Sequence, residues 1–497
     1  MKNKIYYQVI AVFFVLCLSL SNVFAAGVYE PGITGEETVK KGEFNYKEAI
    51  FLTGKPILLS GTAKITESKT SAGSKTTIEY KLENIAENAK LDRKIIYINT
   101  NTQSKYDNQI TQSTDIDPKF KETVQIGSDT FNLTAYQYSK SGLTDDKAII
   151  KYNVYNWNGR KTYTRSGGGE VIVDIKADTY SYDNYWSSTE TSMINNTLTY
   201  KYKDSDSSTA ADYKEVVGTV EYAVSNSKVK NMEYMINEPG AISFKGGYIL
   251  KENEENVVTY VYDVPTMTGW TNTDKRDKGR SSYKLATVPT QTRLFAPPIT
   301  DVASSYWASE DIRAIAALDI ISAVDSSYFR PLSYVSRAEF SRAIVKSANI
   351  QEKTTSKTQE LLFDDVEKNH PYFSFINTAV SAGIISGTGD KKFSPDNYLT
   401  KAQAATIIVR AMGLEQSAVA SATKTNFADD YKIPTWSKKS VNIARSMGIV
   451  SGDADNMLQP DKVLTRAEVS EMINKFIKYL QYDIRKEYRE KLINYGR

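Results

Sequence analysis

A threefold internal repeat near the C-terminus constrains the fold of this chain more than any other feature. Aligning Asp319, Gly383 and Gly448 brings three segments into register. Twelve residues after the aligned position each segment has a proline, and seventeen residues after it each has a serine or threonine. Repeated units of this kind bury their apolar faces against one another. The three segments are therefore predicted to pack together.

Each repeat has the pattern of a helix, a loop and a second helix. In the second and third repeats the first helix ends at Gly383 and Gly448, which suit the left-handed position after a helix end. The second helix of the third repeat has an apolar face at three- and four-residue spacing, formed by Val469, Met472, Ile473, Phe476, Ile477 and Leu480. This part of the chain is predicted to be all-α.

The start of each second helix combines a hydroxyl, a cation, an alanine and a carboxylate or amide. The three versions read "VSRAEF" (335–340), "LTKAQA" (399–404) and "LTRAEV" (464–469). A Ser or Thr followed three residues later by Glu or Gln predicts a capping box, in which each side chain bonds the backbone amide of the other residue. The predicted pairs are Ser336 with Glu339, Thr400 with Gln403, and Thr465 with Glu468.

Capping does not require the cation in this pattern. A positive charge in the first turn opposes the helix dipole, yet it occurs in all three repeats, at Arg337, Lys401 and Arg466. We predict that each cation works with the N-terminal amides of its helix to hold an anion. A solvated surface cation is the alternative.

Acidic and aromatic residues also recur at fixed distances from the aligned position. Asp301, Asp365 and Asp430 stand eighteen residues before it, and Trp307 and Trp436 stand twelve residues before it. Together with the Gly-Ile-Ile, Phe-x-Pro-Asp and Thr-Arg-Ala-Glu elements, these residues resemble the S-layer homology (SLH) domain. The resemblance covers residues 299–480 and has the usual set of three domains.

This resemblance implies a pseudo-threefold trimer of helical repeats with ligand grooves between neighbours. It also implies non-covalent binding to pyruvylated secondary cell wall polysaccharide in Gram-positive-type envelopes. The basic residue of the Thr-Arg-Ala-Glu motif contacts the acidic sugar in this family, and the matching positions are Arg337, Lys401 and Arg466. The further carbohydrate-binding residues carried over are Asp301, Asp365, Asp430, Trp307 and Trp436, with core packing as the alternative for the tryptophans.

The repeats depart from the family pattern, so the three predicted grooves are not equivalent. The first repeat has Asp319 and Ala323 where the others have glycines, and Leu332 where the others have aspartate. The second repeat has lysine in place of arginine, which loses the two-pronged guanidinium fork, and Pro371 in place of tryptophan. We expect the groove that uses the loop of the first repeat to be the weakest.

Residues 28–285 alternate apolar or aromatic with polar side chains, which is typical of half-buried strands. Clear examples lie at 75–82, 94–100, 131–138, 149–157, 196–203, 217–224 and 257–264. The pattern predicts an antiparallel, sandwich-like all-β region with many strands. Residues 286–298 are proline-marked and aperiodic, which indicates a linker.

No catalytic, metal or cofactor site is predicted in the β-rich region. Gly167–Gly169 lacks the Lys-Ser/Thr pair of a phosphate loop and is interpreted as a hairpin tip. Asp204, Asp206 and Asp212 lack the glycine and terminal glutamate of a calcium loop, which favours a solvated turn. The Tyr-x-Tyr pairs fit sheet packing, with stacking on sugars as the alternative.

The N-terminus has the features of a secretory signal peptide: Lys2 and Lys4, an apolar run, and a small-residue exit at Ala25. A retained membrane anchor is the alternative, and Cys17 lacks the small preceding residue of a lipid-attachment signal.

Cleavage of this segment would lower the formal net charge from +3 to +1 and remove the only cysteine. These changes argue against nucleic-acid binding and against disulfides. His370 is the only histidine, so histidine-based chemistry is not predicted.

The patterns together predict a multidomain chain. Its predicted parts are a signal peptide (1–25), a β-rich region of one or two domains (26–285), a linker (286–298), SLH repeats (299–350, 361–414 and 426–480) and a charged helical tail (481–497). We predict a secreted, non-enzymatic S-layer or S-layer-associated protein without cofactors or a later membrane span. Its expected partners are the wall polysaccharide and further copies in a surface layer. A wall-anchored glycan-active enzyme and a surface adhesin are the alternatives.

Overall fold

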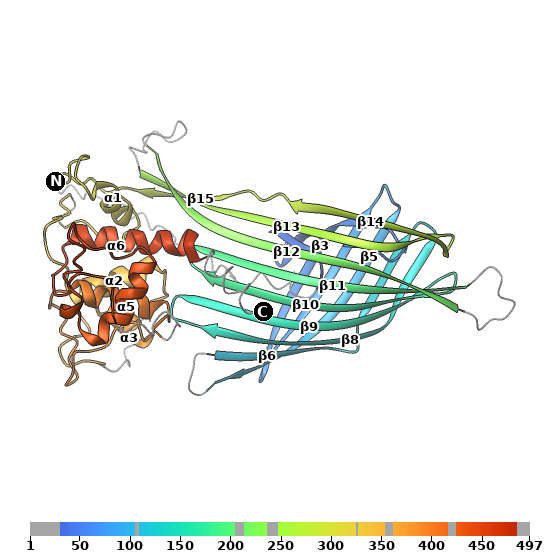
Figure 1. The fold of residues 1–497 in the computed structure, drawn as a ribbon, viewed down its shortest axis with the longest axis horizontal. Coiled ribbons are helices and arrows are strands. Elements are labelled where there is room, and N and C mark those ends of the chain that lie inside the picture. The colour runs from blue at the N-terminus through green and yellow to red at the C-terminus, as the bar shows by residue number, and fades with distance from the viewer. Residues whose placement is uncertain are drawn as a thin grey trace, which may run out of the picture.

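The computed structural model describes residues 30–104, 109–203, 213–235, 247–324, 327–352, 361–415 and 424–484. A β-rich N-terminal half precedes a helical C-terminal half, as the change of periodicity predicts. Figure 1 shows long strands extending away from a group of helices at one end. Within these described ranges, no helix is both long enough and apolar enough to cross a membrane. The predicted signal peptide lies outside the described residues.

The described strands form one antiparallel sheet of fifteen strands. Most strands pair with the next one along the chain, whereas β6 and β7 both lie between β5 and β8, and β15 pairs with β13. The strands are β1 (Ile33–Glu37), β2 (Glu43–Ile50), β3 (Ile57–Thr70), β4 (Gly73–Asn84), β5 (Ala89–Gln103), β6 (Gln109–Ile116), β7 (Lys121–Ile126), β8 (Asp129–Asp146), β9 (Ile150–Arg165), β10 (Glu170–Asn184), β11 (Ser187–Lys203), β12 (Tyr213–Met235), β13 (Gly247–Thr268), β14 (Thr271–Leu285) and β15 (Thr290–Phe295).

This single curved sheet replaces the two packed sheets of the predicted sandwich. Early and late strands face each other across one core, since Tyr200 on β11 and Tyr222 on β12 donate their hydroxyls to the carbonyls of Phe51 (2.6 Å) and Ala49 (3.0 Å). Figure 1 shows the early strands β3 and β5 crossing behind the later ones. Long twisted sheets curl in this way. Alternation along one strand does not reveal it, because curling depends on contacts between strands far apart in sequence.

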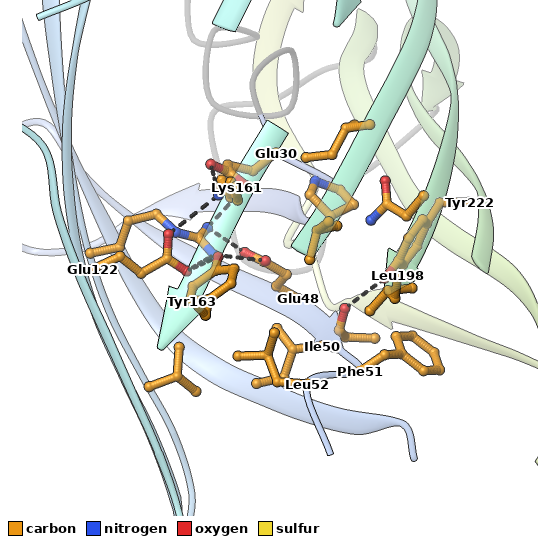
Figure 2. A pocket seen from close by; sticks show the side chains of 17 residues that line it. Glu30, Glu48, Ile50, Phe51, Leu52, Glu122, Lys161, Tyr163, Leu198 and Tyr222 are labelled. Carbon is orange, nitrogen blue, oxygen red and sulfur yellow. Dashed lines mark hydrogen bonds and ion pairs between the residues drawn. The ribbon is translucent and has the colours of Figure 1, made fainter. Parts of the chain in front are cut away.

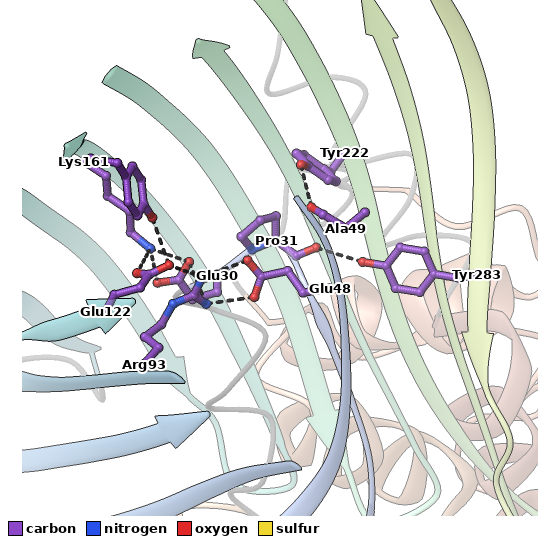
Figure 3. A network of polar contacts seen from close by, with 10 residues as sticks. Glu30, Pro31, Glu48, Ala49, Arg93, Glu122, Lys161, Tyr222 and Tyr283 are labelled. Carbon is purple, nitrogen blue, oxygen red and sulfur yellow. Dashed lines mark hydrogen bonds and ion pairs between the residues drawn. The ribbon is translucent and has the colours of Figure 1, made fainter. Parts of the chain in front are cut away.

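Five charged side chains are buried where the early and late strands meet (Figure 3). The guanidinium of Arg93 on β5 bonds both carboxylate oxygens of Glu48 on β2, at 2.8 and 3.0 Å, and one oxygen of Glu122 on β7, at 2.8 Å. Lys161 on β9 donates to Glu30, just before β1, at 2.7 Å and to Glu122 at 3.3 Å. Because each charge has opposite charges beside it, the network holds four strands and the N-terminal segment together.

A cavity of about 40 Å³ borders this network (Figure 2). Its size suits a few water molecules and excludes a sugar. At Glu122, burial acts to raise the pKa, but the neighbouring Arg93 and Lys161 outweigh burial and lower the pKa to about 2. Burial also raises the pKa of Glu30, and there it prevails over the same two cations. The network is therefore part of the protein's own packing and not a sugar-binding site.

The predicted linker contains the last strand of the sheet. Residues 290–295 form β15, which pairs with residues 247–252 of β13. The adjacent strand β14 pairs with β13 only from residue 256 onward, so β15 fills the remaining length of the same edge. Pro289 and Pro297 flank this strand, and prolines at such positions do not interrupt a ladder. The two halves are therefore not joined by a free tether.

In the described part of the chain, six α-helices follow the sheet, two in each repeat. They are α1 (Ser309–Ala317) and α2 (Arg337–Ser347), α3 (Phe373–Ser381) and α4 (Lys401–Ala411), and α5 (Thr435–Ser446) and α6 (Arg466–Lys478). A short 3₁₀ turn, η3 (Asp430–Lys432), precedes α5. Gly383 and Gly448 have φ angles of 71° and 69°, the left-handed conformation that their place after a helix predicts. Asp319 takes the same conformation in the first repeat, with φ 52°.

The helices dock on one end of the sheet and share a core with it. Trp186, in the turn between β10 and β11, is buried and donates its indole N–H to the carbonyl of Ser347 at 2.6 Å. Ser187 donates its hydroxyl to the carbonyl of Leu480 at 2.5 Å, and Gln481 bonds the carbonyl of Lys230 at 2.6 Å. The helical half is thus fixed to the sheet by apolar packing and by hydrogen bonds.

This contact shows that the chain around the start of the predicted charged tail (481–497) packs on the sheet and is not a fully solvated helix end. A π-helical turn, η4 (Tyr479–Asp483), follows α6, and Tyr479, Leu480 and Ile484 are buried. These apolar side chains face the end of the sheet, which the helical period alone does not predict. Residues 485–497 of the predicted tail lie outside the described residues.

Candidate functional site

The second helix of each repeat begins against the loop of the next repeat, and the third repeat closes onto the first. We call these contacts junction A (repeats 1 and 2), junction B (repeats 2 and 3) and junction C (repeats 3 and 1). In each junction the first amide of the helix donates to a loop carbonyl: Arg337 to Asn397 (2.9 Å), Lys401 to Lys462 (2.9 Å) and Arg466 to Ser333 (2.8 Å). Helix contacts follow the same cyclic order, because α2 packs on α3, α4 on α5 and α6 on α1.

The N-terminal amides of these helices are occupied by the protein itself. The second amide donates to the shared proline carbonyl, as in Ala338 to Pro395, Ala402 to Pro460 and Ala467 to Pro331, each at 3.0 Å. The third amide donates to the N-cap hydroxyl. The predicted use of these amides to hold an anion is therefore wrong, because the first two donate to the neighbouring loop and the third to the N-cap hydroxyl.

Two of the three helices have the full capping box. Thr400 with Gln403 and Thr465 with Glu468 bond reciprocally, whereas Ser336 accepts from the amide of Glu339 without a return bond. The carboxylate of Glu339 instead pairs with Arg466 of the third repeat. The first repeat therefore departs from the local capping pattern because a distant charge competes for its glutamate.

We expect Thr465→Ala to destabilise the helical half by about 0.5–2 kcal/mol, because the amide of Glu468 loses its acceptor and the carboxylate of Glu468 loses the hydroxyl as one of its donors. Ser336→Ala is the matched variant, since Ser336 makes only the one-way cap. Its effect should fall at the lower end of that range. Thermal denaturation followed by the helical circular dichroism signal measures both. A larger loss for Ser336→Ala would contradict the difference between the two caps.

The arginines at junctions A and C enter the loop of the neighbouring repeat in the same way. Arg337 donates to the carbonyls of Phe393 (3.0 Å) and Ser386 (2.8 Å), with its guanidinium 4.8 Å from the centre of the Phe393 ring. Arg466 makes the matching contacts with Phe329 (2.7 Å) and Ser322 (2.5 Å). These arginines are only 7% and 5% exposed. They are not the freely solvated cations of the alternative interpretation.

Lys401 at junction B makes a single hydrogen bond of this kind, to the carbonyl of Ser451 at 2.9 Å. Burial lowers its pKa, and the charge of Lys462 lowers it further. Burial lowers the pKa of Arg337 as well, with Asp365 acting in the opposite direction. Both groups are thus partly desolvated cations, for which a nearby anion would be favourable.

The recurring aspartates hold the loops through backbone amides. Asp301 accepts from the amides of Phe329 (2.8 Å) and Arg330 (2.6 Å), and Asp365 accepts in the same way from Phe393 and Ser394 (both 2.8 Å). Such bonds stabilise the charged carboxylate, and at Asp365 they lower the pKa although burial acts to raise it. Both oxygens of each carboxylate therefore have partners inside the repeat.

In the third repeat this role belongs to Asp429 and not to Asp430. Asp429 accepts from the amides of Leu458 and Gln459, both at 2.8 Å. Asp430 lies in η3 and bonds Thr425 (2.7 Å) and Lys438 (2.8 Å). The third repeat has one more residue between this aspartate and its tryptophan than the first repeat has. An alignment without gaps therefore matches Asp430, and not Asp429, with Asp301 and Asp365.

The two tryptophans are exposed, and Trp307 does not lie beside the cation of its junction. Trp307 and Trp436 are 58% and 57% exposed, so core packing does not describe them. In junction C, Arg466 at the start of α6 bonds Ser322 after the end of α1, whereas Asn474 near the end of α6 bonds Asp311 in the first turn of α1. The two helices are antiparallel. Trp307, two residues before α1, therefore lies toward the opposite end of α6 from Arg466.

Two further predictions can be placed in the structure, and one cannot. Gly167–Gly169 lies in the turn between β9 and β10, as the hairpin interpretation expects. His370 accepts a hydrogen bond from the amide of Tyr372 through Nδ1, at 3.2 Å. The acidic turn of Asp204, Asp206 and Asp212 lies outside the described residues. Across the described ranges, no group of three or more His, Cys, Asp or Glu residues is placed to hold a metal ion.

The family model of the S-layer homology domain matches residues 298–341, 362–405 and 426–470. The chain carries three S-layer homology domains. This confirms the resemblance inferred from the repeats, and the matched ranges contain all three junction cations.

Relatives of this chain include both surface-layer proteins and enzymes. The chain is 25% identical to "Exoglucanase XynX" of Acetivibrio thermocellus over 72% of its own length and 32% of the relative. It is 28% identical to "Amylopullulanase" of Thermoanaerobacterium thermosulfurigenes over 62% of its length and 16% of the relative. It is 25% identical to "Surface-layer 125 kDa protein" of Lysinibacillus sphaericus over 41% of its length and 17% of the relative.

The chain thus spans a third or less of each of these relatives. A match over 72% of the chain is longer than residues 298–497, so it includes part of the β-rich region. The SLH domains and the surface-layer relatives confirm the predicted location at the cell wall or surface layer.

Proposed function

We propose that this chain is a secreted S-layer or S-layer-associated protein, anchored non-covalently to pyruvylated secondary cell wall polysaccharide by its SLH domains. The observation that carries the proposal is the ring of three junctions, each with a buried or half-buried cation at the contact between SLH domains. A pyruvyl ketal supplies the carboxylate that such a cation would attract. The β-rich half extends from this anchor (Figure 1) and is the part that we propose to contact further copies in the surface layer.

Arg337 and Lys401 are the residues that we propose to contact the anion first. Neither forms an ion pair with a carboxylate within the described ranges, and each lies in a partly desolvated junction. An exposed tryptophan, Trp307 or Trp436, offers a flat apolar surface to the less polar face of a sugar ring. Several weak contacts on one rigid unit combine through effective concentration. A long wall polymer can therefore be held firmly without any single tight site.

The experiment is a sedimentation assay with purified cell walls and the whole processed chain, compared before and after mild acid removal of the pyruvyl groups. We expect the chain to sediment with untreated walls and to stay in solution with treated walls, since the junction cations lose their counter-charge. Equal sedimentation with both preparations would overturn the electrostatic mechanism. The whole chain is used because its two halves share a core.

A wall-anchored glycan-active protein is the second candidate, because the exoglucanase and amylopullulanase matches extend into the β-rich region. The absence of enzymatic activity stays a prediction. Release of reducing ends from wall polysaccharide or glucan by the purified chain would favour this candidate over a purely structural protein.

A further inference from the structure

Junction C differs from the other two junctions by one carboxylate. Glu339 gives up the return bond of its own capping box and pairs with the guanidinium of Arg466. The side chain of Arg466 is only 6% exposed, and that of Glu339 only 14%. At Glu339, burial acts to raise the pKa, and Arg466 opposes that effect. The carboxylate thus occupies the position next to Arg466 where an external anion would bind.

The residues matching Glu339 at the other junctions remain with their own helices. Gln403, at junction A, is neutral and completes the capping box of Thr400. Glu468, at junction B, completes the capping box of Thr465 and pairs with Lys462 at 2.6 Å. In the part of the chain that the structure describes, neither Arg337 nor Lys401 has a carboxylate within ion-pair distance.

The acids closest to these two free cations have other partners. Asp365 raises the pKa of Arg337 from nearby, but its oxygens accept from two loop amides. Near Lys401, Glu471 pairs with Lys475 at 2.7 Å, and Asp453 bonds the amide of Met457 at 2.9 Å. These acids therefore do not take the place that Glu339 takes at junction C.

A second acid adds to the neutralisation of junction C. Asp319 stands where the other repeats have glycine, and it pairs with Arg342 at 2.7 Å and Lys346 at 2.6 Å. Arg342 also donates to the carbonyl of Ile320, in the loop that Arg466 enters. Arg342 and Lys346 of the first repeat are thus already paired with an acid of that same repeat.

We propose that Glu339 is a built-in counter-ion that closes junction C, so that the chain binds the acidic sugar of the wall at junctions A and B only. This rests on the proposed function. An external anion at junction C would have to displace Glu339, and the buried carboxylate would then lack a partner, which is strongly unfavourable. At junctions A and B the same anion adds a counter-charge that the partly desolvated cation lacks.

Reciprocal substitutions test this assignment, because Glu339→Gln gives junction C the side chain of junction A and Gln403→Glu does the reverse. The primary probe is a wall polysaccharide fragment with a terminal pyruvyl ketal, titrated into the whole chain by calorimetry. We expect Glu339→Gln to bind one more fragment per chain than wild type, and Gln403→Glu to bind one fewer. Unchanged stoichiometry in both variants would overturn the proposal.

Sodium pyruvate at constant ionic strength is a second probe, which separates this inference from the proposed function. We expect pyruvate to raise the melting temperature of Glu339→Gln more than that of wild type, and to raise that of Gln403→Glu less. If wild type does not bind the wall fragment but this order holds, the proposed function fails and the closure of junction C stands. An identical response of all three proteins to pyruvate would refute the closure. Helical circular dichroism of each variant verifies folding, and Gln403→Glu decides the outcome if Glu339→Gln does not fold.

Discussion

Arg93→Ala is expected to lower the free energy of unfolding of the sheet by about 3–5 kcal/mol, because it leaves buried carboxylates without their principal counter-charge. Arg93 contacts Glu48 and Glu122 directly, and its Nη1 lies 3.4 Å from a carboxylate oxygen of Glu30. Lys161 remains in the variant, but of the three described carboxylates it pairs with Glu30 and Glu122 and not with Glu48. Urea denaturation followed by near-ultraviolet circular dichroism of the buried tyrosines measures the loss.

Arg160→Ala is the matched control for this variant. Arg160 on β9 also bonds a carboxylate through two nitrogens, reaching Asp174 at 2.6 and 3.0 Å. Its side chain is 57% exposed, so water replaces the pair when the arginine is removed. We expect little change in stability. Equal losses for Arg93→Ala and Arg160→Ala would show that the buried network contributes no more than a surface pair.

Lys401→Ala and Arg337→Ala are each expected to weaken binding of a pyruvylated wall fragment by roughly 10- to 150-fold. Each variant loses one charge-assisted hydrogen bond to the fragment, which is worth about 1.5–3 kcal/mol. Lys401 is the cleaner test, since its ammonium has one hydrogen bond among the described residues, to the carbonyl of Ser451. Arg337 also supports the loop of Phe393 and Ser386, so part of its effect will be structural. Calorimetric titration of the whole chain gives the affinities, and thermal denaturation gives the structural share.

Lys478→Ala provides the control for charge alone. Lys478 is exposed at the last position of α6, the end of that helix that is away from its junction. We expect its removal to leave the affinity for the fragment unchanged within a factor of about two, since it is not one of the junction cations and exposed charges are screened by salt. If Lys478→Ala weakened binding as much as Lys401→Ala, the fragment would be recognised by overall charge and not by the junctions.

The repeats allowed the helix starts and helix ends of the helical half to be predicted from the sequence. Helix starts at Arg337, Lys401 and Arg466 follow from the hydroxyl before each of them, and the turns at Gly383 and Gly448 follow from glycine. These features depend on residues within a few positions of each other. The error at Asp430 has a local cause as well, because one additional residue before α5 shifts the equivalent aspartate to Asp429.

The use of each cation could not be predicted in the same way. The spacing of Ser336 and Glu339 matches that of the two true capping boxes, yet Glu339 turns to Arg466, which lies 127 residues further along the chain. The helix amides that were expected to hold an anion donate to carbonyls of the neighbouring repeat. No spacing within one repeat reports either contact, because both partners lie in another repeat.

The sequence by itself determined the order of strands and helices, the threefold repeat and its SLH character, and the positions of the three cations. These properties follow from side-chain periodicity and from residues that act on their own backbone. The tertiary structure alone decided that the strands form one curved sheet, that Arg93 and Lys161 share buried carboxylates, and that junction C has an internal counter-ion. Each of these results depends on which distant segments meet. The energy of a charged side chain is set by its burial and by its partners, and the local sequence pattern specifies neither its burial nor its partners.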